Sequence, residues 1–280
     1  MVASSARRSL TAGRVRSVAA APPGAALADN GAVATYVHFA RFYDALMDDP
    51  LGNGARIRGY LDRHMPDAGS LLELGCGSGS ILAGMPAALS LTGLDRSPQM
   101  LDAARAKVPA ARLIEADMRT FALGERFDAV ICVFDTLNHV ERFEDWRRVF
   151  ERAATHLRDG GLFAFDVNTI GQLRRLGAAG PWTRDLAGVR ITQDVECHAD
   201  GRSTWHVWID ELLDDGRRIR HHERIAELGV PLTAIAGALA GTFTILECSD
   251  DDSGTPDDGS VRAYFLCRRL PRSGGERFGP

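Results

Sequence analysis

The stretch Leu71-Leu72-Glu73-Leu74-Gly75-Cys76-Gly77-Ser78-Gly79 decides the fold, because a short apolar run leads directly into a turn with glycine at alternate positions. The apolar run predicts a buried strand. Glycine in the turn lets the backbone adopt left-handed conformations and pass close to a ligand. A short helix is expected next, and its N-terminus offers free N–H groups to an anion. The turn is therefore a predicted ligand-binding loop.

Strands and helices alternate on both sides of this loop. Helices are expected from the cap Ser97-Pro98 onward, over 144–157 up to Asp159-Gly160-Gly161, and from Pro231 to Gly241. The predicted strands cover 71–74, 90–94, 111–115, 127–133, 162–167, 242–248 and 261–268. This alternation indicates a mostly parallel sheet with helices on both faces.

After Asn168 the pattern changes to three extended runs, 189–198, 203–212 and 217–227. They are separated by Asp-Gly pairs, which are a strong hairpin signal. We therefore expect an inserted antiparallel lid of about three strands, with Trp205 and Trp208 on opposite faces. The expected division of the chain is a weakly ordered leader (1–34), the first part of the core (35–168), the lid (169–227), the completion of the core (228–270) and a loose tail (271–280).

Composition excludes several classes of protein. The chain has 280 residues, 33 Lys+Arg against 37 Asp+Glu, and a net charge of −4. This balance argues against nucleic acid as a partner, because phosphate binding needs a basic face. The five cysteines are scattered without a C-x-x-C pair, which favours a reducing compartment over disulfides or zinc. We expect a cytoplasmic protein with no metal and no membrane span, since Pro231 and three glycines interrupt the apolar run 228–246.

An acidic residue beyond the glycine loop narrows the choice of ligand. Asp95 lies 20 residues after Gly75, at the predicted end of the second strand, where a carboxylate can accept both hydroxyl protons of a ribose. The loop reads G-x-G-x-G rather than the dinucleotide pattern G-x-G-x-x-G, and it lacks the G-K-[ST] of a P-loop.

At this point the sequence resembles the class I S-adenosylmethionine-dependent methyltransferases. Five motifs carry the resemblance in order: ELGCGSG (73–79), LTGLDRSPQML (91–101), EADMR (115–119), FDAVICVFDTLNHV (127–140) and LRDGGLFAFDVN (157–168). The resemblance implies an α/β fold with a doubly wound, Rossmann-like sheet of seven strands, mostly parallel with an antiparallel last strand.

The resemblance also implies a binding site for S-adenosyl-L-methionine along the loop and the ends of the strands. Asp95 would hold the ribose hydroxyls, Asp117 the adenine amino group, and the turn after the fourth strand would line the methyl-donor end. The residues expected to form the site are Glu73, Gly75, Cys76, Gly77, Gly79, Asp95, Arg96, Met100, Asp117, Met118, Phe134 and Asp135.

Three side chains are candidates for catalysis. His139, just past the fourth strand, is a candidate general base, and the alternative is a packing or capping histidine. The segment 36–47 resembles an N-terminal helix that closes over the sulfonium, and Tyr36 or Tyr43 could stabilise that cation. In the alternative interpretation this helix only packs its apolar face on the core.

We expect an enzyme that transfers a methyl group to an amine, or a hydroxyl, of a small-molecule metabolite by in-line displacement. An inserted lid suits a compact acceptor. The alternatives are an O-methyltransferase of a natural-product intermediate, an RNA or protein methyltransferase, a nicotinamide oxidoreductase, and a sensor that binds S-adenosylmethionine without catalysis. The acceptor and the oligomeric state are left open.

Overall fold

The computed structural model describes residues 36–47, 52–186, 188–213 and 215–271. The leader expected over 1–34 lies outside these residues, and so does all but the first residue of the tail expected over 271–280.

The main sheet has seven strands in the order β10-β11-β5-β4-β1-β2-β3. Strands β1 to β5 pair with one another in parallel, whereas the last strand, β11, is antiparallel to both β5 and β10. The predicted fold class is confirmed. The strands are β1 (Ser70–Leu74), β2 (Ser90–Asp95), β3 (Arg112–Glu115), β4 (Phe127–Cys132), β5 (Leu157–Asn168), β10 (Phe243–Ser249) and β11 (Arg262–Arg269).

The order of the strands reverses at β1, which lies between β2 and β4. In open α/β sheets the crevice at the carboxyl ends of such neighbouring strands is where ligands bind. The glycine loop follows β1, Asp95 ends β2 and the segment with Phe134 and Asp135 follows β4. The topology thus gathers the predicted donor-site residues at one edge.

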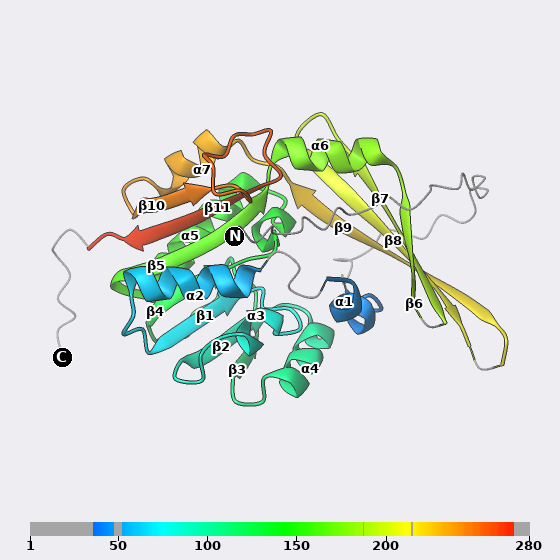
Figure 1. Cartoon of the computed structure of the whole chain (residues 1–280), viewed down its shortest axis with the longest axis horizontal. Helices are drawn as coiled ribbons and strands as arrows, with labels where there is room; N and C mark the ends of the chain where they lie inside the picture. Colours follow the sequence, from blue (N-terminus) through cyan, green and yellow to red (C-terminus); the bar gives the residue numbers. More distant parts are fainter. Residues whose placement is uncertain (1–35, 48–51, 187, 214, 272–280) are drawn as a thin grey trace, which may run out of the picture. The chain divides into compact units, whose positions relative to one another are not determined.

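Helices cover both faces of this sheet (Figure 1). Side chains of a strand alternate between faces, so Leu71 and Ile131 lie in one buried cluster, and Leu72 and Cys132 in the other. The first cluster includes residues of α2 (Asn53–His64), α3 (Ser80–Ala83) and α4 (Pro98–Lys107). The second includes residues of α5 (Phe143–Thr155) and α7 (Leu232–Leu239).

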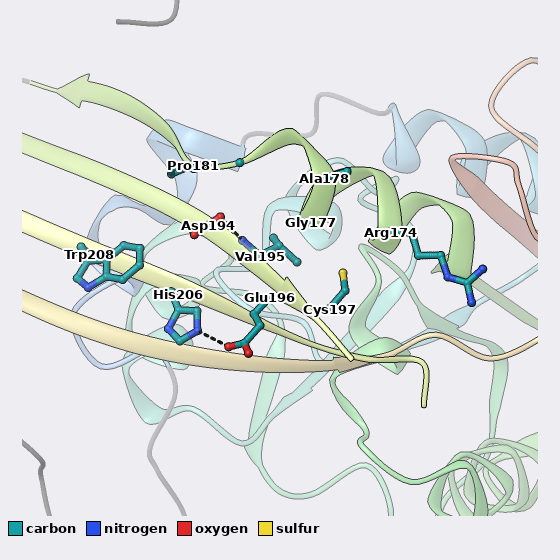
Figure 2. A pocket seen from close by; sticks show the side chains of 11 residues that line it. Arg174, Gly177, Ala178, Pro181, Asp194, Val195, Glu196, Cys197, His206 and Trp208 are labelled. Carbon is teal, nitrogen blue, oxygen red and sulfur yellow. Dashed lines mark hydrogen bonds and ion pairs between the residues drawn. The ribbon is translucent and has the colours of Figure 1, made fainter. Parts of the chain in front are cut away.

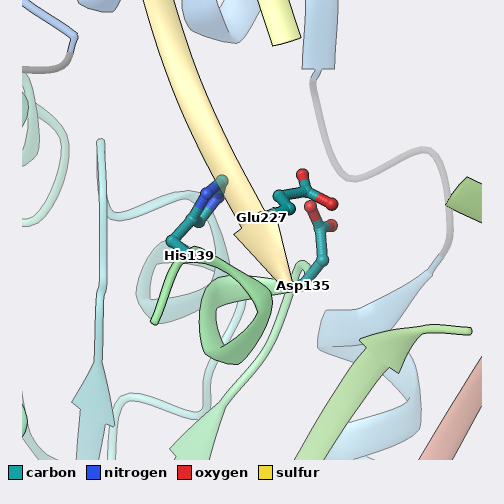
Figure 3. Close-up of side chains that lie close together, drawn as sticks. All are labelled: Asp135, His139 and Glu227. Carbon is teal, nitrogen blue, oxygen red and sulfur yellow. The ribbon is translucent and has the colours of Figure 1, made fainter. Parts of the chain in front are cut away.

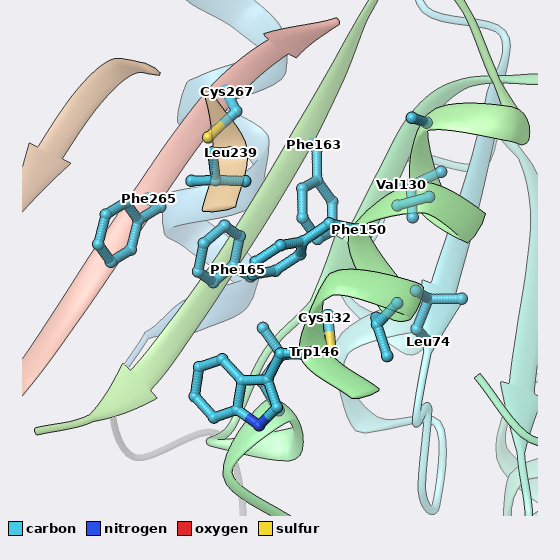
Figure 4. Packing of buried hydrophobic residues seen from close by; sticks show 14 of the residues in the cluster. Leu74, Val130, Cys132, Trp146, Phe150, Phe163, Phe165, Leu239, Phe265 and Cys267 are labelled. Carbon is cyan, nitrogen blue, oxygen red and sulfur yellow. The ribbon is translucent and has the colours of Figure 1, made fainter. Parts of the chain in front are cut away.

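Aromatic rings form the centre of the second cluster (Figure 4). Phe165 of β5 stacks on Phe265 of β11, with ring centroids 4.8 Å apart, and also contacts Phe150 and Phe163. Trp146 is fully buried, and its indole N–H donates to the carbonyl of Val140 at 2.8 Å. These rings fix α5 and β11 against β5.

The lid is a separate antiparallel sheet with the strand order β6-β7-β8-β9. Helix α6 (Ile170–Ala179) leads into β6 (Trp182–Leu186), and β7 (Val189–Cys197), β8 (Arg202–Leu212) and β9 (Arg218–Leu228) come next. The expectation of about three strands was therefore short by one, and α6 was not predicted. The signal for β6 was weak because this strand has five residues and its middle three are exposed.

Two further boundaries differ from the expectation. Helix α5 ends at Thr155, and β5 begins at Leu157, so the segment 159–161 belongs to the strand instead of ending the helix. A register shift between β4 and β5 accommodates the extra residues. Helix α1 (Ala40–Met47) begins four residues after Tyr36, and its apolar side chains cluster with lid residues such as Ile191 and Ile225.

Among the residues that the structure describes, no helix combines the length and the apolar character that a bilayer crossing requires. The run 228–246 contains α7 and the start of β10, as its glycines and Pro231 predict.

Replacing Phe165 by Ala should lower the free energy of unfolding by about 3–5 kcal/mol, because the ring is 1% exposed and its loss leaves a cavity among three other phenylalanines. Urea unfolding followed by circular dichroism measures this change. Leu212, which is 52% exposed, is the matched control, and Leu212→Ala should shift stability by less than about 0.5 kcal/mol. Equal losses for the two variants would contradict the placement of this core.

Candidate functional site

The glycine loop has the backbone conformation that its sequence predicts. Gly75, Gly77 and Gly79 have φ angles of 66°, 51° and 77°, which are left-handed. A Cβ on Gly75 would lie 2.2 Å from Cγ2 of Thr136, so no larger residue fits there. A Cβ on Gly77 would meet nothing within 4 Å, so this glycine faces open space. The loop leaves room for a ligand at its centre.

Asp95 faces this loop from the end of β2. Its carboxylate accepts hydrogen bonds from the backbone N–H of Gly77 and of Ser97, each at 2.8 Å. Each oxygen keeps a lone pair, so the carboxylate can still accept two ribose hydroxyls. Burial raises the pKa of Asp95, and the two N–H donors partly offset that rise. The geometry fits the ribose-binding role expected for this residue.

The other residues expected near the donor fall into two groups. Glu73, Cys76 and Met100 are buried. Arg96 is exposed. Asp117 forms a salt bridge with Arg119, whose guanidinium lowers the pKa of the aspartate, and Met118 packs against the core.

The turn after β4 is strained. Phe134 and Asp135 have φ angles of 60° and 50°, which non-glycine residues seldom adopt. Buried Asp166 of β5 holds them there, because its two carboxylate oxygens accept the backbone N–H of Phe134 at 3.0 Å and of Asp135 at 2.8 Å. Such strain costs about 1–3 kcal/mol per residue and persists only where other contacts enforce it.

Arg262 of β11 completes this arrangement. Its guanidinium forms ion pairs with Asp166 and with Asp135, at 2.9 Å for Asp135. Burial raises the pKa of Asp166, and Arg262 opposes that rise. Asp135, Asp166 and Arg262 therefore link the turn after β4 to β5 and to the antiparallel strand β11.

His139 ends η1 (Thr136–His139), the short helical turn that comes after the strained residues. Asn138 anchors this turn by donating to the carbonyls of Asn168 at 3.0 Å and Leu228 at 2.9 Å. His139 Nδ1 lies 3.3 Å from the carbonyl of Ala226, and Nε2 lies 3.4 Å from the hydroxyl of Tyr36. A carbonyl only accepts, so Nδ1 carries the proton and Nε2 accepts from Tyr36.

Burial lowers the pKa of His139, so the imidazole is neutral at pH 7. The ring of Tyr36 lies edge-on to that of Tyr43, with centroids 5.9 Å apart. Burial raises the pKa of both phenols. The structure therefore brings the three candidate catalytic side chains together, with hydroxyls that stay protonated.

Helix α1, which carries Tyr43, is fastened to the glycine loop. Asp44 accepts hydrogen bonds from Ser78 at 2.5 Å and Ser80 at 3.2 Å. Lys107, the one lysine of the chain, forms a 2.7 Å salt bridge with Asp44. The helix is thus joined to the loop that is predicted to bind the donor.

Asp135, His139 and Glu227 of β9 lie close together where η1 meets the lid (Figure 3). Each offers a ligand atom within 4.8 Å of the others, so the group has the spacing to hold a cation. Burial and the neighbouring Asp135 raise the pKa of Glu227 well above its usual range. Because Arg262 already neutralises Asp135 in part, we expect no metal ion here.

A separate hollow of about 690 Å³ lies between α6 and the strands β7 and β8 (Figure 2). Trp208 and His206 line it, with the two rings stacked 5.5 Å apart. Trp205 packs instead with the cluster around Tyr36 and Phe39. The prediction that Trp205 and Trp208 face opposite sides is confirmed.

Together, the sheet, the glycine loop and Asp95 define an α/β protein whose site can hold a ribose, with a cluster of buried side chains after β4. The family described as "Methyltransferase domain" matches residues 71–161. A dTDP-3-amino-3,6-dideoxy-α-D-glucopyranose N,N-dimethyltransferase of Streptomyces fradiae is 30% identical over 171 residues, which are 60% of this chain and 67% of that relative. A dTDP-3-amino-3,4,6-trideoxy-α-D-glucopyranose N,N-dimethyltransferase of Streptomyces venezuelae is 33% identical over 67% of this chain and 74% of its own length.

Among solved structures, an S-adenosylmethionine-dependent methyltransferase from Clostridium acetobutylicum shares the fold, with a TM-score of 0.74 at 21% identity over 84% of this chain and 99% of its own. The chain belongs to the class I S-adenosylmethionine-dependent methyltransferases. It is an enzyme, and S-adenosylmethionine is its methyl donor.

Sequence reasoning missed the residues that reach the site from a distance. Asp166 was part of a quoted motif without a role, although an acid inside an apolar strand is a usable signal. Arg262 carries the same signal in β11. Glu223 and Glu227 share one face of β9 with Ile225, a mixture of charged and apolar side chains that does not predict burial, and only the packed lid reveals that they are buried.

Replacing Asp95 by Ala should weaken binding of S-adenosylhomocysteine by about 2 kcal/mol, roughly thirtyfold, because two hydrogen bonds to a charged acceptor are lost. Isothermal titration calorimetry measures the affinity. Asp102→Ala is the control, because Asp102 is an exposed acid on α4, and its affinity should not change. Unchanged affinity in the Asp95 variant, with folding intact, would contradict the assignment.

Proposed function

We propose that this methyltransferase transfers its methyl group to an amine of a small molecule, with an amino sugar as the favoured acceptor. The observation that carries the proposal is the acidic group formed by Asp135, Glu227 and Asp166 beside His139. The two relatives described above support it, since both are named as N,N-dimethyltransferases of amino sugars. A sugar N-methyltransferase of Streptoalloteichus also shares the fold, with a TM-score of 0.71 at 21% identity over 90% of this chain and its whole own length.

The charge at this place favours a cationic acceptor. Asp135 and Asp166 share the single guanidinium of Arg262, and Glu227 adds a third carboxyl group, 2% exposed. Negative charge therefore exceeds the positive charge that Arg262 supplies. A protonated amine can donate hydrogen bonds to Asp135 and Glu227 and balance the charge. A carboxylate acceptor would be repelled.

S-adenosylmethionine supplies an activated methyl group on a positively charged sulfur, so the protein needs chiefly to align the acceptor and exclude water. Glu227 and Asp135 can bind the amine as an ammonium and take its proton. Tyr36 and His139, joined by their hydrogen bond, would enclose the acceptor on the side opposite the two carboxyl groups. We propose that these residues and Tyr43 bound the reacting centre, with His139 orienting Tyr36 and available as an alternative proton acceptor.

A direct test compares an amine with its hydroxyl counterpart. dTDP-3-amino-3,6-dideoxy-α-D-glucose should gain a mass of one methyl group or two when incubated with the enzyme and S-adenosylmethionine, and dTDP-6-deoxy-α-D-glucose should gain none. Mass spectrometry of the products measures this difference. Methylation of hydroxyl compounds without methylation of amino sugars would contradict the proposal.

Replacing Glu227 by Gln should lower kcat/KM for the amine by about tenfold or more, because an ammonium loses a charged partner. Below the raised pKa of Glu227 the carboxyl is protonated and cannot pair with the amine. The kcat/KM of the wild type should therefore rise with pH through that pKa, and the variant should lack this rise. Glu196→Gln, an exposed lid glutamate, is the control and should keep the wild-type profile. An unchanged profile in the Glu227 variant would remove Glu227 from the site.

A further inference from the structure

The lid strand β9 approaches the proposed acceptor site through five consecutive residues, 223–227. These residues lie next to Tyr36, His139 and Asp135. Glu223 binds the backbone at Tyr36, the carbonyl of Ala226 faces His139 Nδ1, and a carboxylate oxygen of Glu227 lies within 4.8 Å of one of Asp135. Glu223 and Glu227 lie on one face of the strand with Ile225 between them, by the period of two. One stretch of the lid thus approaches segments that are about 90 and about 190 residues away along the chain.

Glu223 binds three backbone N–H groups of the segment before α1. Its Oε2 accepts the backbone N–H of Tyr36 at 2.8 Å. Its Oε1 accepts the backbone N–H of His38 at 2.5 Å and of Phe39 at 3.0 Å. The side chain is 6% exposed. One buried carboxylate therefore satisfies three backbone donors just before α1, where no helical carbonyl is available to them.

These bonds matter because Tyr36 is held in an unusual conformation. Its φ angle is 66°, which is left-handed and disfavoured for a residue with a large side chain. In this conformation the phenol reaches His139 and packs against Tyr43. An accepting carboxylate at Tyr36 N–H helps to offset the strain, together with the ring contacts and the 3.4 Å hydrogen bond of the phenol.

We propose that Glu223 is a positioning residue that holds Tyr36 over the reacting centre, so that the lid strand assembles the acceptor site instead of merely covering it. Glu223 acts through the backbone of Tyr36 and does not touch the acceptor. The kinetic part of the test rests on the proposed function, and the exchange part does not.

Glu223→Gln is the informative variant. The amide keeps one accepting oxygen and places a donor NH2 in the other position, so either Tyr36 or the pair His38 and Phe39 faces a donor and loses its bond. Glu211→Gln is the matched control, because Glu211 also joins the lid to α1, through an ion pair with Arg41, but lies away from Tyr36.

The first measurement is hydrogen–deuterium exchange of the ligand-free protein, read on the peptide that contains Tyr36, His38 and Phe39. Exchange should be at least about tenfold faster in Glu223→Gln than in the wild type, because broken bonds expose these amides. It should be unchanged in Glu211→Gln. Equal exchange in the Glu223 variant and the wild type would overturn the proposal, whichever acceptor the enzyme uses.

The second measurement is a double-mutant cycle with Tyr36→Phe, using the amino sugar and its rate of methylation. Each single variant should lower kcat by about tenfold or more, because misplacement of a group near the reacting atoms is costly. The double variant should be no slower than the slower single variant, since both changes remove the same hydroxyl contact. Multiplicative losses would show that Glu223 does not act through Tyr36 and would overturn the proposal.

Failure of the proposed function gives a different pattern. If no amine is methylated by the wild type, the amine assignment fails while the exchange result still decides the role of Glu223. If amines are methylated and exchange is unaffected by Glu223→Gln, the function stands and the positioning role falls.

Discussion

The carboxylate of Asp166 is the contact on which the site depends. It lies fully buried in β5, where its oxygens accept the backbone N–H groups of Phe134 and Asp135 and the guanidinium of Arg262. A buried carboxylate is costly to desolvate and is stable only with such partners. The strained turn after β4 therefore exists because β4, β5 and β11 meet at this residue. Asp135 and His139 take their places from that turn.

The lid supplies the other half of the site. Strand β9 brings Glu223 to Tyr36 and Glu227 to Asp135, while Asn138 joins η1 to the end of β9 through the carbonyl of Leu228. Helix α1 is held by Glu223 near one end and by Lys107, through Asp44, near the other. The glycine loop, the lid and helix α1 are therefore joined by direct contacts. We expect a displacement of one of them to shift the others through these contacts.

The sequence predicted what is local. The conformation of the glycine loop, the position of Asp95 at the end of β2 and the order of the seven strands of the main sheet follow from spacing, turn chemistry and apolar runs, and the structure agrees at each. Glu223 and Glu227 could not be found in this way, because two acids on the same face as Ile225 do not indicate from the sequence whether that face is buried or solvated. Their burial depends on the register of β8 and β9 and on how the lid meets Tyr36 and Asp135. Strand β6 and helix α6 were not predicted, because their sequences lack a strong apolar pattern.

The central claim is that the carboxyl pair of Asp135 and Glu227 receives the amine of the acceptor. A crystal structure of the protein with S-adenosylhomocysteine and dTDP-3-amino-3,6-dideoxy-α-D-glucose tests it most directly. The account predicts the amino nitrogen at about 3 Å from a carboxylate oxygen of Glu227 or Asp135, with the ribose of the donor product on Asp95. An amino group directed away from both carboxylates would contradict the account.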